Sequence, residues 1–103
     1  MSLNEYVQGT PVEVEFFFQS PSTRERFSPD NITFTYGVGQ SMTWTTGGAT
    51  VPALGVIAEV GVGHFIATID TSTLMGTIST QAEGTGGVQG IGLHQFIVTP
   101  KYY

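Results

Sequence analysis

The 103-residue chain contains no cysteine, which excludes disulfide bonds and thiolate metal sites. It has no apolar run long enough to span a membrane, and its first residues lack the basic and apolar segments of a secretion signal. We therefore expect a protein that does not associate with a membrane and that is made and assembled in the cytoplasm.

Charged residues are scarce, and positive ones are the scarcest. They make up 11% of the chain, against about 25% in a typical soluble domain. Arg24, Arg26 and Lys101 are the only basic side chains, and the formal net charge is -5. Because so few cations cannot neutralise a run of phosphates, we expect no nucleic-acid binding.

The sequence also lacks the usual patterns of catalytic and metal-binding side chains. His64 and His94 have no histidine or carboxylate partner at short spacing, and no serine lies in a GxSxG turn. Glu13 and Glu15 would lie about 7 Å apart on a strand, which is conceivable for a glycosidase pair, but a solvated strand face explains them better. We expect no enzymatic activity, no metal and no cofactor.

Glycine, proline and threonine are abundant, and they favour strands and turns over helices. The chain has 14 glycines and 5 prolines. Apolar and polar residues alternate at a period of two in short segments. These segments are 10–19, 31–36, 41–46, 56–60, 64–70, 77–83 and 93–100. About seven strands with turns at roughly 8–12-residue spacing predict an all-β protein with an antiparallel β-sandwich.

The alternation also predicts which side chains face the core. In the first strand Val12, Val14, Phe16 and Phe18 share one face, with Glu13, Glu15 and Phe17 on the other. In the later strands Ile32, Phe34 and Tyr36 are expected to face inward, as are Met42 and Trp44. The sets that share one face in the remaining strands are Phe65, Ala67 and Ile69, then Ile78, Thr80 and Ala82, and then His94, Phe96 and Val98. Gly61 and Gly63 are predicted as turn residues of a hairpin, and residues 84–92 as a glycine-rich loop.

We predict one domain over residues 10–100, with an N-terminal arm at 1–9 and a C-terminal tail at 101–103. Tyr6, Tyr102 and Tyr103 are amphipathic side chains of the kind that anchor interfaces, which makes them candidate partner-binding residues in these ends. Frayed termini are the alternative.

Arg24 and Arg26 form the one basic spot of an acidic chain. Such a spot suits docking on an acidic partner surface, so both arginines are candidate partner-binding residues. A solvated loop would have the same sequence.

Several segments together resemble a known protein family. They are GTPVEVEF at Gly9–Phe16, GVGHFIATI at Gly61–Ile69, GTISTQAEGTG at Gly76–Gly86 and FIVTP at Phe96–Pro100. In this order they resemble the pattern of small Ig-like β-sandwich structural proteins of tailed-bacteriophage virions, and the resemblance covers nearly the whole domain. The family pattern has tryptophans where this chain has Ile78 and Ala82.

The resemblance implies an Ig-like sandwich that acts as a non-catalytic virion structural protein, assembled in the host cytoplasm. A capsid decoration or auxiliary head protein that docks on the major capsid protein shell is the main expectation. A tail or head–tail junction component is the alternative position. Its partners would be the major capsid protein or other virion proteins, with multiple copies or a homo-oligomer on the virion.

A glycan-binding Ig-like module is the alternative of a different class. It would need a flat, exposed aromatic side chain such as Trp44 or Tyr36 to stack on a sugar ring. Since Trp44 alternates with threonines, we expect it to point inward with Met42, which argues against this function.

An exposed sheet edge would also permit strand addition by a partner's arm.

Overall fold

The computed structural model describes residues 4–100, which form short strands and one turn of 3-10 helix. The strands are β1 (Asn4–Val7), β2 (Val12–Phe17), β3 (Asn31–Tyr36), β4 (Gln40–Thr45), β5 (Ile57–Gly61), β6 (His64–Ile69), β7 (Gly76–Ile78), β8 (Thr80–Gly84), β9 (Val88–Gln89) and β10 (Phe96–Thr99). The helical turn is η1 (Thr85–Gly87). The predicted all-β class is confirmed.

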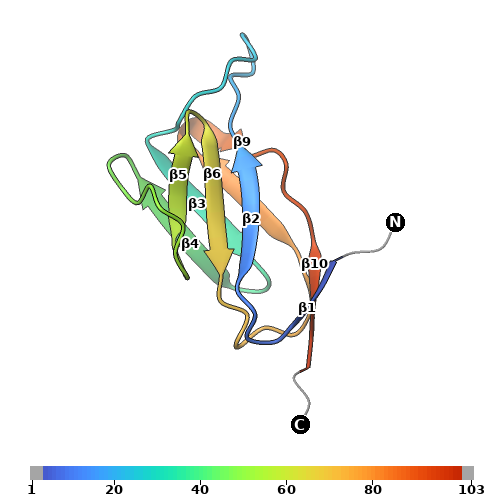
Figure 1. The fold of residues 1–103 in the computed structure, drawn as a ribbon. Coiled ribbons are helices and arrows are strands. Elements are labelled where there is room, and N and C mark those ends of the chain that lie inside the picture. The colour runs from blue at the N-terminus through green and yellow to red at the C-terminus, as the bar shows by residue number, and fades with distance from the viewer. Residues whose placement is uncertain (1–3, 101–103) are drawn as a thin grey trace.

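The strands form a β-sandwich (Figure 1). One layer has the strand order β2-β6-β5, and the layer behind it has the order β4-β3-β8-β9. A third group, β1-β10-β7, lies beside them, and only Ser79 separates β7 from β8. All pairs are antiparallel except β1 and β10, which run parallel.

The core lies between the two layers and is rich in phenylalanine. Phe16 stacks on Phe34 at 5.5 Å and on Phe65 at 5.8 Å between ring centroids. Each buried side chain of this size contributes about 1.5–3 kcal/mol relative to an exposed one. The strand residues predicted to share these faces are buried, except Tyr36 and Thr80, which are half-buried, and His94, which is exposed.

The turn Gly61–Gly63 joins β5 to β6 as the predicted hairpin, and its two glycines play different roles. Gly63 has a φ of 63°, whereas Gly61 lies at a β-bulge that follows Glu59. A Cβ on Gly63 would lie 2.8 Å from the carbonyl oxygens of both Phe18 and Phe27. The hairpin therefore packs directly against the segment that follows β2.

The N-terminal segment differs from its prediction. Residues 4–7 of the expected arm 1–9 form β1, which pairs with β10 from Asn4↔Phe96 to Val7↔Thr99. Four residues with one half-buried aromatic show no period-two pattern, so this strand depends on a partner far away in the sequence. The expected tail 101–103 lies outside the described residues.

The structure corrects three further predictions, all of which concern the C-terminal half of the chain. Residues 77–83 do not form one strand, because the chain leaves one group of strands at Ser79 and enters the other. Residues 84–92 are not only a loop, since they contain η1 and β9. His94 precedes β10 and is exposed, so it does not share the buried face of Phe96.

Candidate docking site

The connection between β2 and β3 forms a closed tip at the upper end of the molecule (Figure 1). Gln19 and Arg26 form an isolated antiparallel bridge at its base. Ser20 N–H donates to the Glu25 carbonyl at 2.8 Å, and Arg24 N–H donates to the Ser20 carbonyl at 2.8 Å. The tip is therefore an ordered hairpin whose backbone groups bond to one another.

Arg24 has an unusual backbone conformation within this tip. Its φ of 62° makes it the only non-glycine residue with a positive φ among residues 4–100. The left-handed region costs an ordinary L-residue about 1–2 kcal/mol. Gln19 Nε2 donates to the Arg24 carbonyl at 2.8 Å, and this bond helps to hold the conformation while the arginine side chain is exposed. Strain of this kind is concentrated at functional positions.

Arg26 heads a stack of side chains on the outer face of β2 and β6. Its guanidinium carbon lies 4.0 Å from the centre of the Phe17 ring, and Phe17 stacks on His64 at 4.5 Å between ring centroids. His64 Nε2–H donates to Glu15 Oε2 at 2.8 Å. A cation–π contact at an exposed site contributes about 0.5–1 kcal/mol. These four side chains, hereafter the Arg26 stack, therefore hold the Arg26 guanidinium in place as the second positive charge of the tip.

A shallow hollow of about 210 Å³ lies beside Arg24. Gln19, Ser20, Pro21, Gln89 and Ile91 line it together with that arginine. Ile91 is 46% exposed, so the hollow offers an apolar surface and amide groups next to a positive charge. This combination fits a carboxylate side chain with an apolar neighbour on a partner protein.

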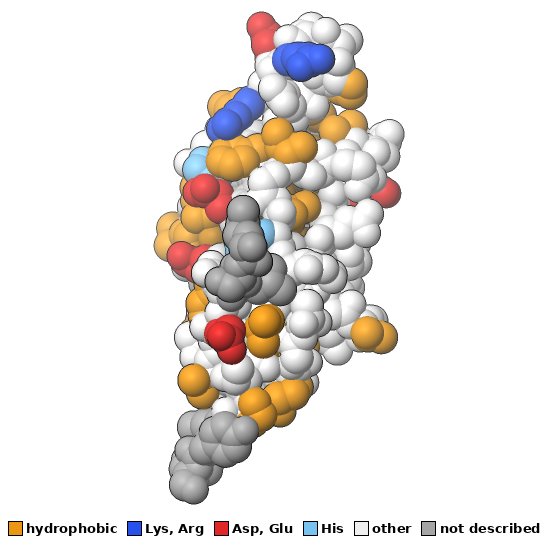
Figure 2. All heavy atoms as spheres, turned by 90° about the vertical axis from the view of Figure 1, so that its right-hand side faces the viewer, with side chains coloured by type: hydrophobic (Ala, Val, Ile, Leu, Met, Phe, Trp, Pro, Cys, Tyr) orange, Lys and Arg blue, Asp and Glu red, His pale blue; other side chains and the backbone are white. Residues whose placement is uncertain are grey.

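The two described arginines lie at the same end of the molecule (Figure 2). Glu25 lies between them, so the tip carries two positive charges and one negative, a net of +1, on a chain whose net charge is -5. The other carboxylates are spread over the rest of the molecule, for example on β1, β2 and β8. The tip is therefore the part of the described chain that is best suited to an acidic surface.

Tyr6 does not join this site. It lies on β1, away from the tip, and its half-buried ring makes an edge contact with Phe96 at 5.8 Å between centroids. Tyr6 therefore helps to attach β1 to the core. Tyr102 and Tyr103 lie outside the described residues.

Among residues 4–100, no group of three or more histidine, aspartate and glutamate side chains lies close enough together to hold a metal ion. Glu15 Oε2 accepts a hydrogen bond from His64 Nε2–H on the neighbouring strand. No helix among residues 4–100 is long and apolar enough to cross a membrane.

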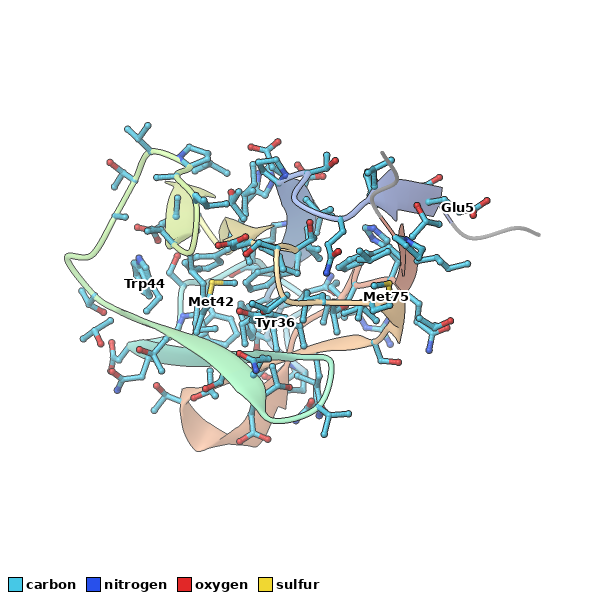
Figure 3. The ribbon with its side chains drawn as sticks, turned by 90° about the horizontal axis from the view of Figure 1, so that it is seen from below. Glu5, Tyr36, Met42, Trp44 and Met75 are labelled. Carbon is cyan, nitrogen blue, oxygen red and sulfur yellow. The ribbon has the colours of Figure 1, made fainter. Side chains whose placement is uncertain are left out.

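The aromatic side chains considered for glycan stacking are largely covered. Trp44 is 5% exposed, its Nε1–H donates to the Ala49 carbonyl at 3.2 Å, and its ring meets Phe65 edge-on at 5.0 Å. Figure 3 shows Trp44 and Met42 together, with Tyr36 beside them. The inward orientation predicted for Trp44 is confirmed, and the described surface offers no flat aromatic platform from these residues.

Sequence reasoning found the two arginines but missed Phe17, His64 and Ile91 as their neighbours. Phe17 gave a usable signal, because it is an aromatic residue on the face of its strand that carries glutamates. Ile91 gave none, because its pairing with Phe17 joins segments distant in sequence. The chain matches no protein-family model, no curated protein and no solved structure.

Proposed function

We propose that the protein is a non-catalytic structural component of a tailed-bacteriophage virion. Its main role is that of a decoration or auxiliary head protein that docks on the major capsid protein shell. The observation that carries this proposal is the tip, an ordered element that presents Arg24 and Arg26 outward at one end of a small sandwich. The partner surface would be acidic.

The strand order supports the Ig-like part of the proposal. Ig-type sandwiches pair their second, fifth and fourth main strands in one sheet and their third, sixth and seventh in the other. If β1 is the first strand and β4 an added one, β2, β6 and β5 take the places of the first set, in that order. The places of the second set fall to β3, the β7–β8 segment and β10.

The motif positions are consistent with the same reading. Gly9, at the start of the first motif, has a φ of 96° and turns the chain into β2. The second motif covers the turn between β5 and β6 together with β6, the third covers β7 and β8, and the fourth covers β10. The residues that carry the resemblance are thus turn and core residues, which support the fold, while the tip supports docking.

The test is co-sedimentation with capsid shells that lack the protein, with the bound copies counted per shell. We expect wild-type protein to bind in proportion to the major capsid subunit. The double variant Arg24→Ser, Arg26→Ser should bind about tenfold more weakly or worse, since each lost charge contact at a docking surface costs on the order of 1 kcal/mol.

The matched control is Val38→Glu, Thr50→Glu, which changes the net charge by the same -2 at two exposed positions outside the tip. It should bind like the wild type. Absence of wild-type binding would overturn the head assignment, and equal binding of the arginine variant would remove the tip from the interface. Binding limited to about a dozen copies would favour the head–tail junction.

A further inference from the structure

The outer edge of β4 lacks the features that normally prevent an edge strand from pairing with a strand of another molecule. β4 is the terminal strand of the β4-β3-β8-β9 sheet. Its six residues, Gln40–Thr45, include no charged residue and no proline, and its pairing with β3 runs without a bulge. Natural edge strands are usually protected by charge, proline or a bulge, and an edge without them is prone to pair with another strand.

The backbone groups of β4 that are free to pair follow from its register. Thr46 N–H donates to the Asp30 carbonyl at 2.9 Å, and the register continues through Trp44↔Ile32 and Met42↔Phe34. Because antiparallel pairs alternate between bonded and non-bonded positions, Trp44 and Met42 bond to β3. The N–H and C=O groups of Ser41 and Thr43 therefore point away from β3, toward the open edge.

The chain that follows β4 borders the C-terminal part of this edge, where Gly48 N–H donates to the Thr45 carbonyl at 2.8 Å. A hollow of about 410 Å³ adjoins the edge, lined by residues 43–49 of β4 and the following turn and by residues 55–57 at the start of β5. The β4–β5 connection meets β5 through one backbone bond, from Glu59 N–H to the Ala49 carbonyl at 2.9 Å. Within the described residues no strand pairs with β4 on this side.

The sequence of β4 is complementary to itself around Thr43. In an antiparallel pair of two copies centred there, Thr43 faces Thr43, Ser41 faces Thr45, and Met42 faces Trp44. Threonine and serine pairs stabilise cross-strand contacts on the exposed face, and a methionine next to an aromatic ring does so on the inner face. No like charges meet, and the arrangement has the closed two-fold symmetry of most homodimers.

We propose that two copies of this chain pair through β4, antiparallel and centred on Thr43, so that two four-stranded sheets join into one. This inference does not depend on the virion role, because it concerns the purified protein alone. It also differs from docking by the tip, since the tip lies at the β2–β3 connection and not on β4.

Sedimentation equilibrium tests this pairing over protein concentrations from about 1 µM to about 1 mM, a range that covers weak and moderate dimers. We expect the apparent mass to rise toward twice the 11.0 kDa of one chain. Thr43→Lys should raise the dimer dissociation constant at least tenfold, because two lysines would face each other on the axis. Thr43→Pro should do the same by removing an outward N–H, which an edge strand tolerates.

The matched control is Thr33→Lys, at the position directly opposite Thr43 on β3. In the dimer its two copies lie about three strand spacings apart, roughly 14 Å, so the dimer should persist. Folding of each variant is checked by the blue-shifted emission of buried Trp44. A wild-type protein that stays monomeric over the whole range would overturn the proposal. So would a dimer that survives both substitutions of Thr43 unchanged.

Discussion

At the scale of the residue, Arg24 presents an exposed positive charge from a left-handed backbone conformation that lowers the stability of the fold. Replacing it with glycine removes the side-chain penalty of the left-handed conformation but gives the unfolded chain more freedom. We expect Arg24→Gly to raise the free energy of unfolding by about 0.5–1 kcal/mol in urea denaturation while weakening docking on shells.

The matched control is Ser22→Gly in the same tip, where φ is not positive, and it should lower stability by about 0.5–1 kcal/mol. A loss of stability in both variants would mean that Arg24 makes stabilising contacts that outweigh its strain.

Asp70 provides a pH-dependent contribution from a single side chain. The pKa of its carboxyl is held below the ordinary 3.8, first by the Ser72 backbone N–H, which donates to Oδ1 at 3.0 Å, and then by the Ser72 hydroxyl. A lowered folded-state pKa stabilises the fold above the unfolded-state pKa, and this stabilisation is lost as the pH falls through the folded-state value.

The stability advantage of the wild type over Asp70→Asn should therefore be constant near neutral pH and shrink below about pH 4. Urea denaturation of both proteins from pH 7 down to about pH 2 measures the difference. Parallel stability curves over this range would contradict the assignment.

At the scale of the element, the β5–β6 hairpin is locked onto the segment after β2 through Gly63. Any Cβ at this position meets backbone atoms on two sides and adds the cost of a φ of 63°. We expect Gly63→Ala to lower the free energy of unfolding by about 3 kcal/mol or more.

Gly39→Ala is the control in the β3–β4 turn, with a φ of 76° and no atom within 4 Å of the added Cβ, and it should cost only about 1 kcal/mol. Equal losses in the two variants would show that backbone conformation alone, and not close packing, sets the cost at Gly63.

Elements that bury one complete face were predictable from the sequence, and elements held by distant partners were not. β2 alternates in this way, and in β6 the period of two gives the buried Phe65, Ala67 and Ile69 but not Thr68, which is buried as well. β1 has only Tyr6 to bury, and β9 has two residues, so each exists because another strand provides its hydrogen bonds. The break at Ser79 follows from the position of β10, which local sequence does not encode.

The candidate docking site was likewise predictable from the sequence only in part. The charges of Arg24 and Arg26 were evident against an acidic chain, but the left-handed conformation of Arg24 depends on the closed bonding of the tip. The Arg26 stack contains residues from three separate segments of the chain. Only Phe17, an aromatic residue on the outward face of its strand, could have indicated it from the sequence.

At the scale of the whole molecule, a basic tip on an acidic sandwich makes docking dependent on salt. Raising the ionic strength from about 0.05 M to about 0.5 M shortens the screening length to a few ångströms. We expect the number of wild-type copies bound per shell to fall over this range, whereas the residual binding of Arg24→Ser, Arg26→Ser should change little. Salt-independent binding of the wild type would exclude charge as the basis of docking.

The parallel pairing of β1 with β10 has a mechanical consequence. Tension applied at Asn4 and Pro100 pulls these two neighbouring strands in opposite directions along their length, so the bonds of all four registered pairs carry the load together. A hairpin such as β5–β6, pulled apart at its open end, would instead lose its bonds one at a time. The fold therefore resists tension between Asn4 and Pro100 far better than tension that separates two paired strands from one end.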